Sequence, residues 1–177
     1  ICFLTYGGKN DYKFIPHNSS IKIIKIFENI QKSKFKILNL FKSIFFIIKY
    51  NKKIESFDYY KSNQNYGSWI AAFLKFKYKK KFISRGGYDL FHFSLYKKNI
   101  FKIIVSYLIC FIAYKSADIV YVPTVFYKKF IQKYFFISKN VHILPNFVDT
   151  EIFKVDKSRR YKLKLLFVGR LVKQKNI

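Results

Sequence analysis

The sequence is poor in residues that cross-link or interrupt a chain. Its 177 residues include no Met, two Cys, three Pro and six Gly. Because Cys2 and Cys110 stand alone, a disulfide-rich secreted scaffold and a structural zinc site with paired cysteines are excluded. The longest apolar stretch, 103–114, contains a serine, and it is much shorter than the roughly 20 residues that cross a bilayer. The sequence therefore predicts neither a disulfide framework nor a transmembrane helix.

Acidic residues and arginine are also scarce. Nine Asp and Glu stand against 35 Lys and Arg, only four of which are Arg, and the formal net charge is +26. A strongly basic chain is typical of nucleic-acid-binding proteins, but direct readers of bases and phosphates favour the planar fork of Arg. Three interpretations stay open: a compositional bias toward residues of A/T-rich codons, attraction to an anionic membrane, and nucleic-acid binding. A membrane would meet the Lys-rich segments 75–81 and 97–102.

What the sequence has in quantity is apolar and aromatic material, 51% and 21% of its residues. Intrinsic disorder is therefore excluded, and a packed core is expected. Hydrophobic periodicity and Gly or Pro punctuation predict alternating elements. The predicted strands are 1–6, 21–26, 57–60, 81–84, 118–122, 141–144 and 163–168. The predicted helices are 34–50, 68–78, 97–115 and 124–135, with Ser68 and Thr124 as N-caps of the second and the fourth.

Two of the predicted helices have informative apolar patterns. In 34–50, Leu38, Phe41, Phe45 and Ile48 fall on one side, with Asn39 and Ser43 on the other. The helix 97–115 is apolar on nearly all sides, which predicts that it is buried. Strands that alternate with helices predict an α/β fold, a Rossmann-like parallel sheet with helices on both faces.

Ligands of such sheets bind beyond the carboxyl ends of the strands. Polar residues and glycines concentrate in the segments that follow the predicted strands. These segments are Gly7-Gly8, 62–67, 85–92, Pro123-Thr124, 145–149 and 169–175.

Several of these segments resemble the family 4 retaining glycosyltransferases. The likeness is carried by ADIV at 117–120, NVHILPNFVDTEIF at 140–153 and LLFVGRLVKQKNI at 165–177, in the family's order and spacing. Upstream, YKSNQ at 60–64 with Gly67, and FISRGGY at 82–88, resemble motifs of a subset of that family. Phe147, Thr124 and Asn176 depart from the common Gly, Ser and Gly.

The resemblance implies a GT-B fold, in which two Rossmann-like domains face each other across a cleft. Residues 1–145 would form the acceptor-side N-terminal domain without its first strand, 146–160 the linker, and 161–177 the start of the nucleotide-sugar-binding domain. We therefore expect an internal piece of a longer protein that is inactive by itself. The family's two catalytic glutamates would follow Ile177, so no catalytic residue is assigned.

The resemblance assigns Gly169, Arg170 and Lys175 to the donor diphosphate. A strand that ends at Gly before a helix start offers free backbone N–H groups to an anion. Arg170 can bind a phosphate bidentately, and fixed cations stabilise the charge of a leaving diphosphate. The alternative is an ordinary turn with solvated basic side chains.

Further cleft candidates follow the earlier strands. Arg85, Gly86 and Tyr88 would approach a phosphate of donor or acceptor, and Asn63 and Gln64 would recognise acceptor hydroxyls; a plain surface turn is the alternative for both. Asn146 and Asp149 indicate a structural turn. No metal site is predicted and no cofactor is needed, since the nucleotide sugar is a substrate.

Together these observations predict a sugar transferase that retains anomeric configuration and acts on a saccharide or lipid-linked acceptor in cell-surface polysaccharide or glycolipid synthesis. We expect it in the cytoplasm, in peripheral contact with the anionic inner face of the membrane. The alternatives are a basic nucleic-acid-binding α/β domain, which the scarcity of Arg disfavours, and a non-catalytic membrane-surface module.

Overall fold

The computed structural model describes residues 2–7, 20–50, 54–87, 89–96, 99–154 and 167–169. The chain divides into two compact units, Ile1–Pro145 and Asn146–Ile177. The helices and strands of the described residues all lie in the first unit. The acceptor and donor roles assigned to the two parts of the chain stay predictions.

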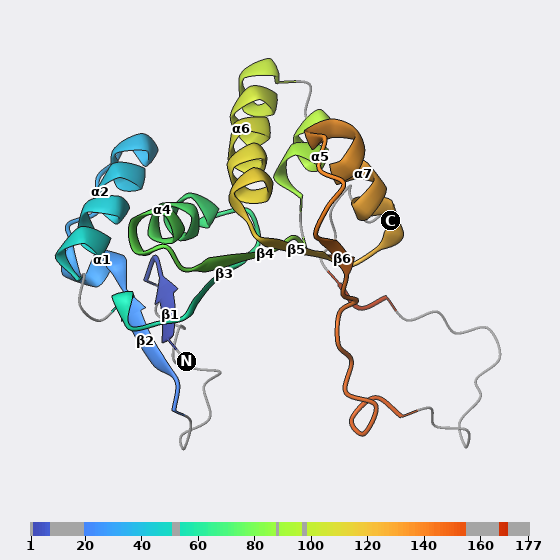
Figure 1. The fold of residues 1–177 in the computed structure, drawn as a ribbon, viewed down its shortest axis with the longest axis horizontal. Coiled ribbons are helices and arrows are strands. Elements are labelled where there is room, and N and C mark those ends of the chain that lie inside the picture. The colour runs from blue at the N-terminus through green and yellow to red at the C-terminus, as the bar shows by residue number, and fades with distance from the viewer. Residues whose placement is uncertain are drawn as a thin grey trace. The chain divides into compact units, whose positions relative to one another are not determined.

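Four parallel strands form the main sheet of the first unit (Figure 1). They are β3 (Tyr59–Asn63), β4 (Lys81–Arg85), β5 (Ile119–Val122) and β6 (Val141–Ile143), and their order in the sheet is their order in the chain. The connecting helices are α4 (Ser68–Tyr78), α5 (Leu90–Leu95), α6 (Ile100–Ser116) and α7 (Val125–Phe135). The predicted α/β fold, a parallel sheet flanked by helices, is confirmed.

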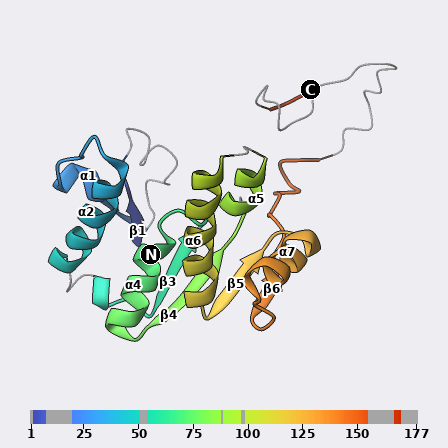
Figure 2. The ribbon, with the colours of Figure 1, turned by 90° about the horizontal axis from the view of Figure 1, so that it is seen from above.

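The described helices cover one face of this sheet, whereas the sequence predicted helices on both faces. α4 packs on β3 and β4, α6 on β4, and α7 on β5 and β6, and both ribbon views place them on the same side (Figures 1 and 2). Successive right-handed crossovers that advance in one direction across a sheet put their helices on one face. Burial follows this arrangement: Tyr60, Phe82 and Val120 point into the core, while their strand neighbours Tyr59 and Lys61 are exposed.

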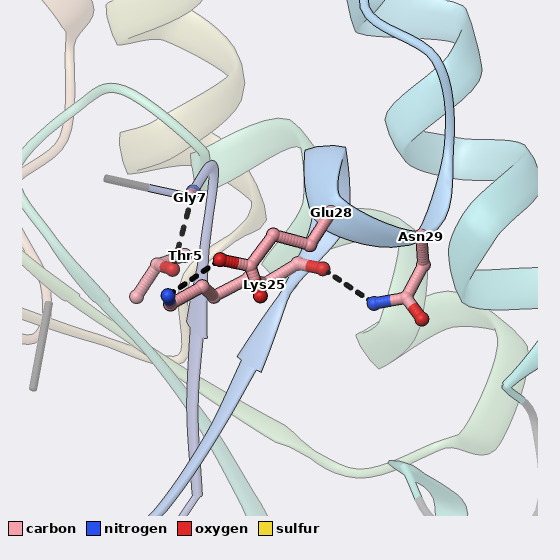
Figure 3. A network of polar contacts seen from close by, with 5 residues as sticks. All are labelled: Thr5, Gly7, Lys25, Glu28 and Asn29. Atoms are coloured by element: carbon pink, nitrogen blue, oxygen red, sulfur yellow. Dashed lines mark hydrogen bonds and ion pairs between the residues drawn. The ribbon is translucent and has the colours of Figure 1, made fainter. Parts of the chain in front are cut away.

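A second, smaller sheet precedes the first. It pairs β1 (Cys2–Thr5) with β2 (Lys22–Lys25) in parallel, and α1 (Ile26–Asn29) and α2 (Lys36–Lys49) follow. Figure 3 shows how polar contacts fix the carboxyl ends of these strands. Lys25 Nζ lies 2.6 Å from Glu28 Oε1, and the Gly7 amide donates to Thr5 Oγ1 at 3.3 Å. Gly7 has φ +92°, a conformation that side chains with a Cβ rarely adopt.

Two buried clusters form the core on the helical side. One joins α5, α6 and α7 to β5 and β6; the other joins α1, α2 and α4 to β3 and β4. Ala117, between α6 and β5, packs against both clusters. The main sheet is therefore backed by a continuous helical layer.

Several predicted details differ from the structure. The brief strand expected at 57–60 is β3, displaced toward the C-terminus, so that Ser62 and Asn63 belong to a strand. The cap expected at Ser68 is Gly67, and Ser68 instead donates a hydrogen bond to the Asn65 carbonyl. Of the predicted strand 163–168, Phe167 and Val168 are described; both are exposed and lie outside any strand.

The most consequential differences concern the helices α2 and α6. α2 buries Ser43, Phe46 and Ile47, whereas the apolar side seen in the sequence, Leu38, Phe41, Phe45 and Ile48, is exposed. α6 buries Cys110, Ala113 and Tyr114 but leaves most of its other apolar side chains in contact with solvent. The prediction of a buried α6 is therefore wrong, because apolar residues on all sides do not reveal how much of a helix the fold covers. No helix in the described part of the chain is long and apolar enough to span a bilayer.

Candidate functional site

The carboxyl ends of the four strands meet at one edge of the main sheet. The Gln64 amide donates to the Arg85 carbonyl at 2.8 Å, and the Gly86 amide donates to the Tyr121 carbonyl at 2.8 Å. The backbone ladder thus continues beyond β3 and β4 into the segments that the sequence singled out. Four predicted cleft residues, Asn63, Gln64, Arg85 and Gly86, lie together there.

Strand register extends this group into a row across the sheet. Asn63 pairs with Arg85, Arg85 with Tyr121, and Tyr121 with His142. Side chains at paired positions project from the same face. We call Asn63, Arg85, Tyr121 and His142 the polar row. It lies on the face opposite α4 and α6, since the neighbouring Ser62, Ser84 and Val120 are buried on the helical side.

The polar row combines groups that suit a polar, anionic ligand. A guanidinium binds phosphate or carboxylate through two parallel N–H donors, and Arg85 is half-buried, which limits its exposure to water. Asn63 adds an amide, and the rings of Tyr121 and His142 have centroids 6.0 Å apart. Asn63 and His142 are exposed, so this edge is open to solvent.

Sequence reasoning missed Tyr121 and His142 as members of this site. Each lies inside a predicted strand rather than in the polar segment that follows it. Alternation within a strand predicts which residues share a face. It places Tyr121 and His142 on the face of Arg85 only when the register between the strands is also known.

A buried hydrogen-bonded group supports the segment that follows Arg85. Asp89 is nearly inaccessible to solvent; one carboxylate oxygen accepts the His92 amide at 2.7 Å and caps α5, and the other accepts the Tyr114 hydroxyl at 2.5 Å. Burial and the Asp89 carboxylate raise the pKa of Tyr114 well above its ordinary value. They also raise the pKa of the Cys110 thiol. Tyr114 and Cys110 therefore stay protonated at neutral pH, and their roles are structural.

Gly86 lies directly against this group. A Cβ at Gly86 would approach the Tyr114 hydroxyl to 3.1 Å. A side chain at position 86 would therefore push the Tyr114 hydroxyl by a few tenths of an ångström away from its place beside Asp89. Tyr88, the remaining candidate in this segment, lies outside the described residues.

The resemblance motif at 117–120 has a structural role in this unit. Asp118 accepts hydrogen bonds from Lys75 Nζ at 2.8 Å and from the Phe82 amide at 2.8 Å. Partial burial opposes ionisation of Asp118, but these hydrogen bonds and the Lys75 charge outweigh it and lower the pKa of the carboxyl group. Asp118 thus ties α4 and β4 to the start of β5.

His92 belongs to an aromatic cluster rather than to the polar row. Its ring lies 5.0–5.6 Å from the rings of Tyr96, Tyr127 and Phe130. His92, Tyr96 and Phe130 border a groove of about 500 Å³ between α5 and α7, together with Lys129 and Lys133. Another hollow, of about 800 Å³, adjoins β2 and is bordered mainly by apolar and small polar residues. Neither hollow includes a residue of the polar row.

The second unit carries the predicted donor-side residues. Gly169 is described and exposed, whereas Arg170 and Lys175 lie outside the described residues. At the start of this unit the Glu151 amide donates to Asp149 Oδ1 at 2.9 Å, and the Phe153 amide donates to the Asp149 carbonyl at 2.9 Å. The structural turn predicted at Asp149 is present. Within the described residues, no three His, Cys, Asp or Glu side chains gather as metal ligands do.

Compared with known protein families and with curated proteins, the chain matches neither.

Proposed function

We propose that this chain forms the acceptor-side part of a retaining glycosyltransferase similar to family 4. The enzyme would move a sugar from a nucleotide-sugar donor to a saccharide or lipid-linked acceptor in cell-surface polysaccharide or glycolipid synthesis. The observation that carries the proposal is the polar row, which lies at the carboxyl edge of a parallel α/β sheet, where ligands of such folds bind.

The residues of this edge suit distinct parts of the reactants. Arg85 would hold a phosphate of the acceptor or donor, because its guanidinium can form two charge-assisted hydrogen bonds. Asn63 and Gln64 would bind sugar hydroxyls through their amides, and Tyr121 offers an apolar ring face to a pyranose. In the proposal Gly169, Arg170 and Lys175 hold the donor diphosphate and stabilise its charge as it leaves.

The proposal includes a location. The protein would work in the cytoplasm at the inner face of the membrane, where a lipid-linked acceptor presents its sugar. Neither a metal nor a cofactor enters the proposed reaction, since the nucleotide sugar itself supplies the transferred group.

A sugar-transfer assay tests the proposal. It uses the protein encoded by the whole reading frame that contains this sequence, with any residues that follow Ile177. Radiolabelled UDP- and GDP-sugars are incubated with lipid-linked acceptors, and the anomeric configuration of the product is read by NMR. Transfer with retention is the expected result.

Two substitutions connect that activity to the named residues. Removal of a charge-assisted contact worth about 1.5–3 kcal/mol predicts that Arg85→Ala or Arg170→Ala lowers kcat/KM roughly ten- to hundredfold. Lys should restore only part of the loss, because an ammonium cannot reproduce the fork. The matched control is Lys61→Gln. Lys61 lies on the same face of the sheet as Asn63, two residues earlier in β3, and its substitution should leave kcat/KM unchanged. Wild-type kinetics in both Ala variants would contradict the site.

A further inference from the structure

α6 exposes a continuous apolar surface on the helical side of the molecule. We define the α6 apolar face as the seven side chains that are between 37% and 77% exposed: Ile100, Phe101, Ile104, Val105, Leu108, Phe111 and Ile112. They recur at spacings of three and four, so they follow one side of the helix along its length. The opposite side carries Cys110, Ala113 and Tyr114 into the core. An exposed apolar surface of this extent marks an interaction site rather than ordinary solvent-facing structure.

The helices of this layer carry an excess of positive charge, although Asp118, beside the end of α6, pairs with Lys75. Within their stated bounds, α2, α4, α5, α6 and α7 contain no Asp or Glu. They carry ten Lys: 36, 42, 49, 75, 77, 102, 115, 128, 129 and 133. On α6 itself Lys102 and Lys115 are exposed at either end of the apolar face. The matching surface must therefore be apolar at its centre and negative around it.

This requirement selects among the possible occupants. A second copy of the chain brings another net charge of +26 against the first, and like charges that face each other disfavour association. An anionic lipid bilayer supplies both properties at once, since acyl chains take up apolar side chains while the headgroups attract Lys. A helix of 17 residues is about 25 Å long, which suits a position in the plane of the interface.

We propose that the α6 apolar face docks this chain on an anionic membrane surface, with its large side chains among the acyl chains and with Lys102 and Lys115 at the headgroups. The site lies on the helical side of the sheet, opposite the polar row. It does not depend on the proposed sugar transfer, because lipid binding is measured without donor or acceptor.

Co-sedimentation with vesicles tests the proposal on the full 177-residue chain. The wild-type chain should bind vesicles of phosphatidylglycerol and phosphatidylcholine in equal parts, and binding to phosphatidylcholine alone should be much weaker. Ile104→Ser/Leu108→Ser/Phe111→Ser should weaken binding roughly tenfold or more, because three apolar side chains that would enter the acyl region are lost. Tyr59→Ser/Phe136→Ser/Phe147→Ser removes aromatic side chains elsewhere that are even more exposed, and it should bind like the wild type.

The charge contribution has its own matched pair. Lys102→Gln/Lys115→Gln should weaken binding roughly fivefold per lysine, the equivalent of about 1 kcal/mol each. Lys61→Gln/Lys139→Gln lowers the net charge equally outside the helical layer and should change binding far less. Equal losses in the two pairs would overturn a localised site, since they would mean that total charge alone sets the affinity.

A single label keeps the proposal falsifiable if the triple variant does not fold. Leu108→Cys in a Cys2→Ser background is labelled with the environment-sensitive dye NBD, while Cys110 is fully buried and therefore protected. The emission should shift to the blue on anionic vesicles and be quenched by brominated acyl chains, whereas the same label at Tyr59→Cys should not respond. Absence of the shift at position 108 overturns the proposal. A second outcome also overturns the proposal: the wild-type chain forms a dimer in sedimentation and does not bind vesicles, and the triple variant is a monomer.

Discussion

At the scale of single residues, Asp89 organises the segment behind the polar row. Its carboxylate receives one hydrogen bond from the start of α5 and one from Tyr114 in α6. Because Asp89 is nearly inaccessible to solvent, its hydrogen bonds replace the water that a carboxylate needs. Tyr114 belongs to α6, which follows later in the chain. The position of Gly86 and the path of the chain after Arg85 therefore depend on the contact between Asp89 and Tyr114.

Tyr114→Phe should destabilise the chain measurably. The substitution keeps the buried ring but leaves one Asp89 oxygen without its hydroxyl donor, which costs about 1–3 kcal/mol of unfolding free energy. Urea denaturation at neutral pH measures this loss. Tyr107→Phe, on the same helix, removes only a long contact of 3.4 Å to the Tyr134 carbonyl and serves as the control. Equal stability of the two variants would contradict the role of Asp89.

At the scale of elements, strand parity decides which surface each side chain joins. In β3 and β4 the alternate residues Tyr60, Ser62, Phe82 and Ser84 enter the core, and the residues between them form the open face. The start of a helix is also fixed by residues close to it in the chain. Thr124 accepts the Tyr127 amide at 3.3 Å and caps α7, as predicted from its place after Pro123.

Thr124→Ala should lower the unfolding free energy by about 1 kcal/mol, within the range of about 0.5–2 kcal/mol for lost N-caps. Thr124→Ser preserves the accepting oxygen and should stay close to the wild type. Chemical denaturation of the three proteins side by side measures the difference. A loss in the Ser variant as large as that in the Ala variant would mean that the methyl group, rather than the cap, stabilises this position.

At the scale of the whole molecule, raised pKa values occur in both core clusters, at Tyr60 in one and at Tyr114 and Cys110 in the other, and also at Tyr6 outside them. Partial burial raises the pKa of Tyr6 to about 12. Burial is also the largest cause at Tyr60, and together with the charges of Tyr78 and Glu55 it raises the pKa of that phenol to about 12. Tyr114 and Cys110 are raised as well. In each case the folded chain holds its proton more tightly than the unfolded chain does.

These shifts predict alkaline destabilisation. Stability from raised pKa values is fully present below the ordinary pKa and is lost as the pH rises above about 9–10, since only the unfolded chain then releases protons. Each group that ionises only in the unfolded chain lowers the unfolding free energy by about 1.4 kcal/mol per pH unit. Urea midpoints between pH 8 and pH 11 measure the decline, and Tyr114→Phe should make it shallower. Midpoints that stay constant up to pH 11 would contradict the shifts.

Local physics explains how much of the fold could be read from the sequence. Apolar periodicity and the Gly and Pro positions predicted ten of the described elements in type and order, including α4 at Ser68–Tyr78 and β5 at Ile119–Val122. Cleft candidates such as Asn63 and Arg85 also followed from local rules, because polar residues after apolar strands indicate the ligand-binding edge.

Only the tertiary structure decided which of these residues become neighbours. The polar row depends on the register between strands that are distant in the chain, so Tyr121 and His142 carried no local sign of their place beside Arg85. The same holds for α2 and α6, where periodicity reveals which residues share a side but not which side the rest of the protein covers. The chain by itself determined its elements, since they arise from contacts between near neighbours. The folded sheet and its helical layer determined the surfaces, because burial is set by whatever packs against each element.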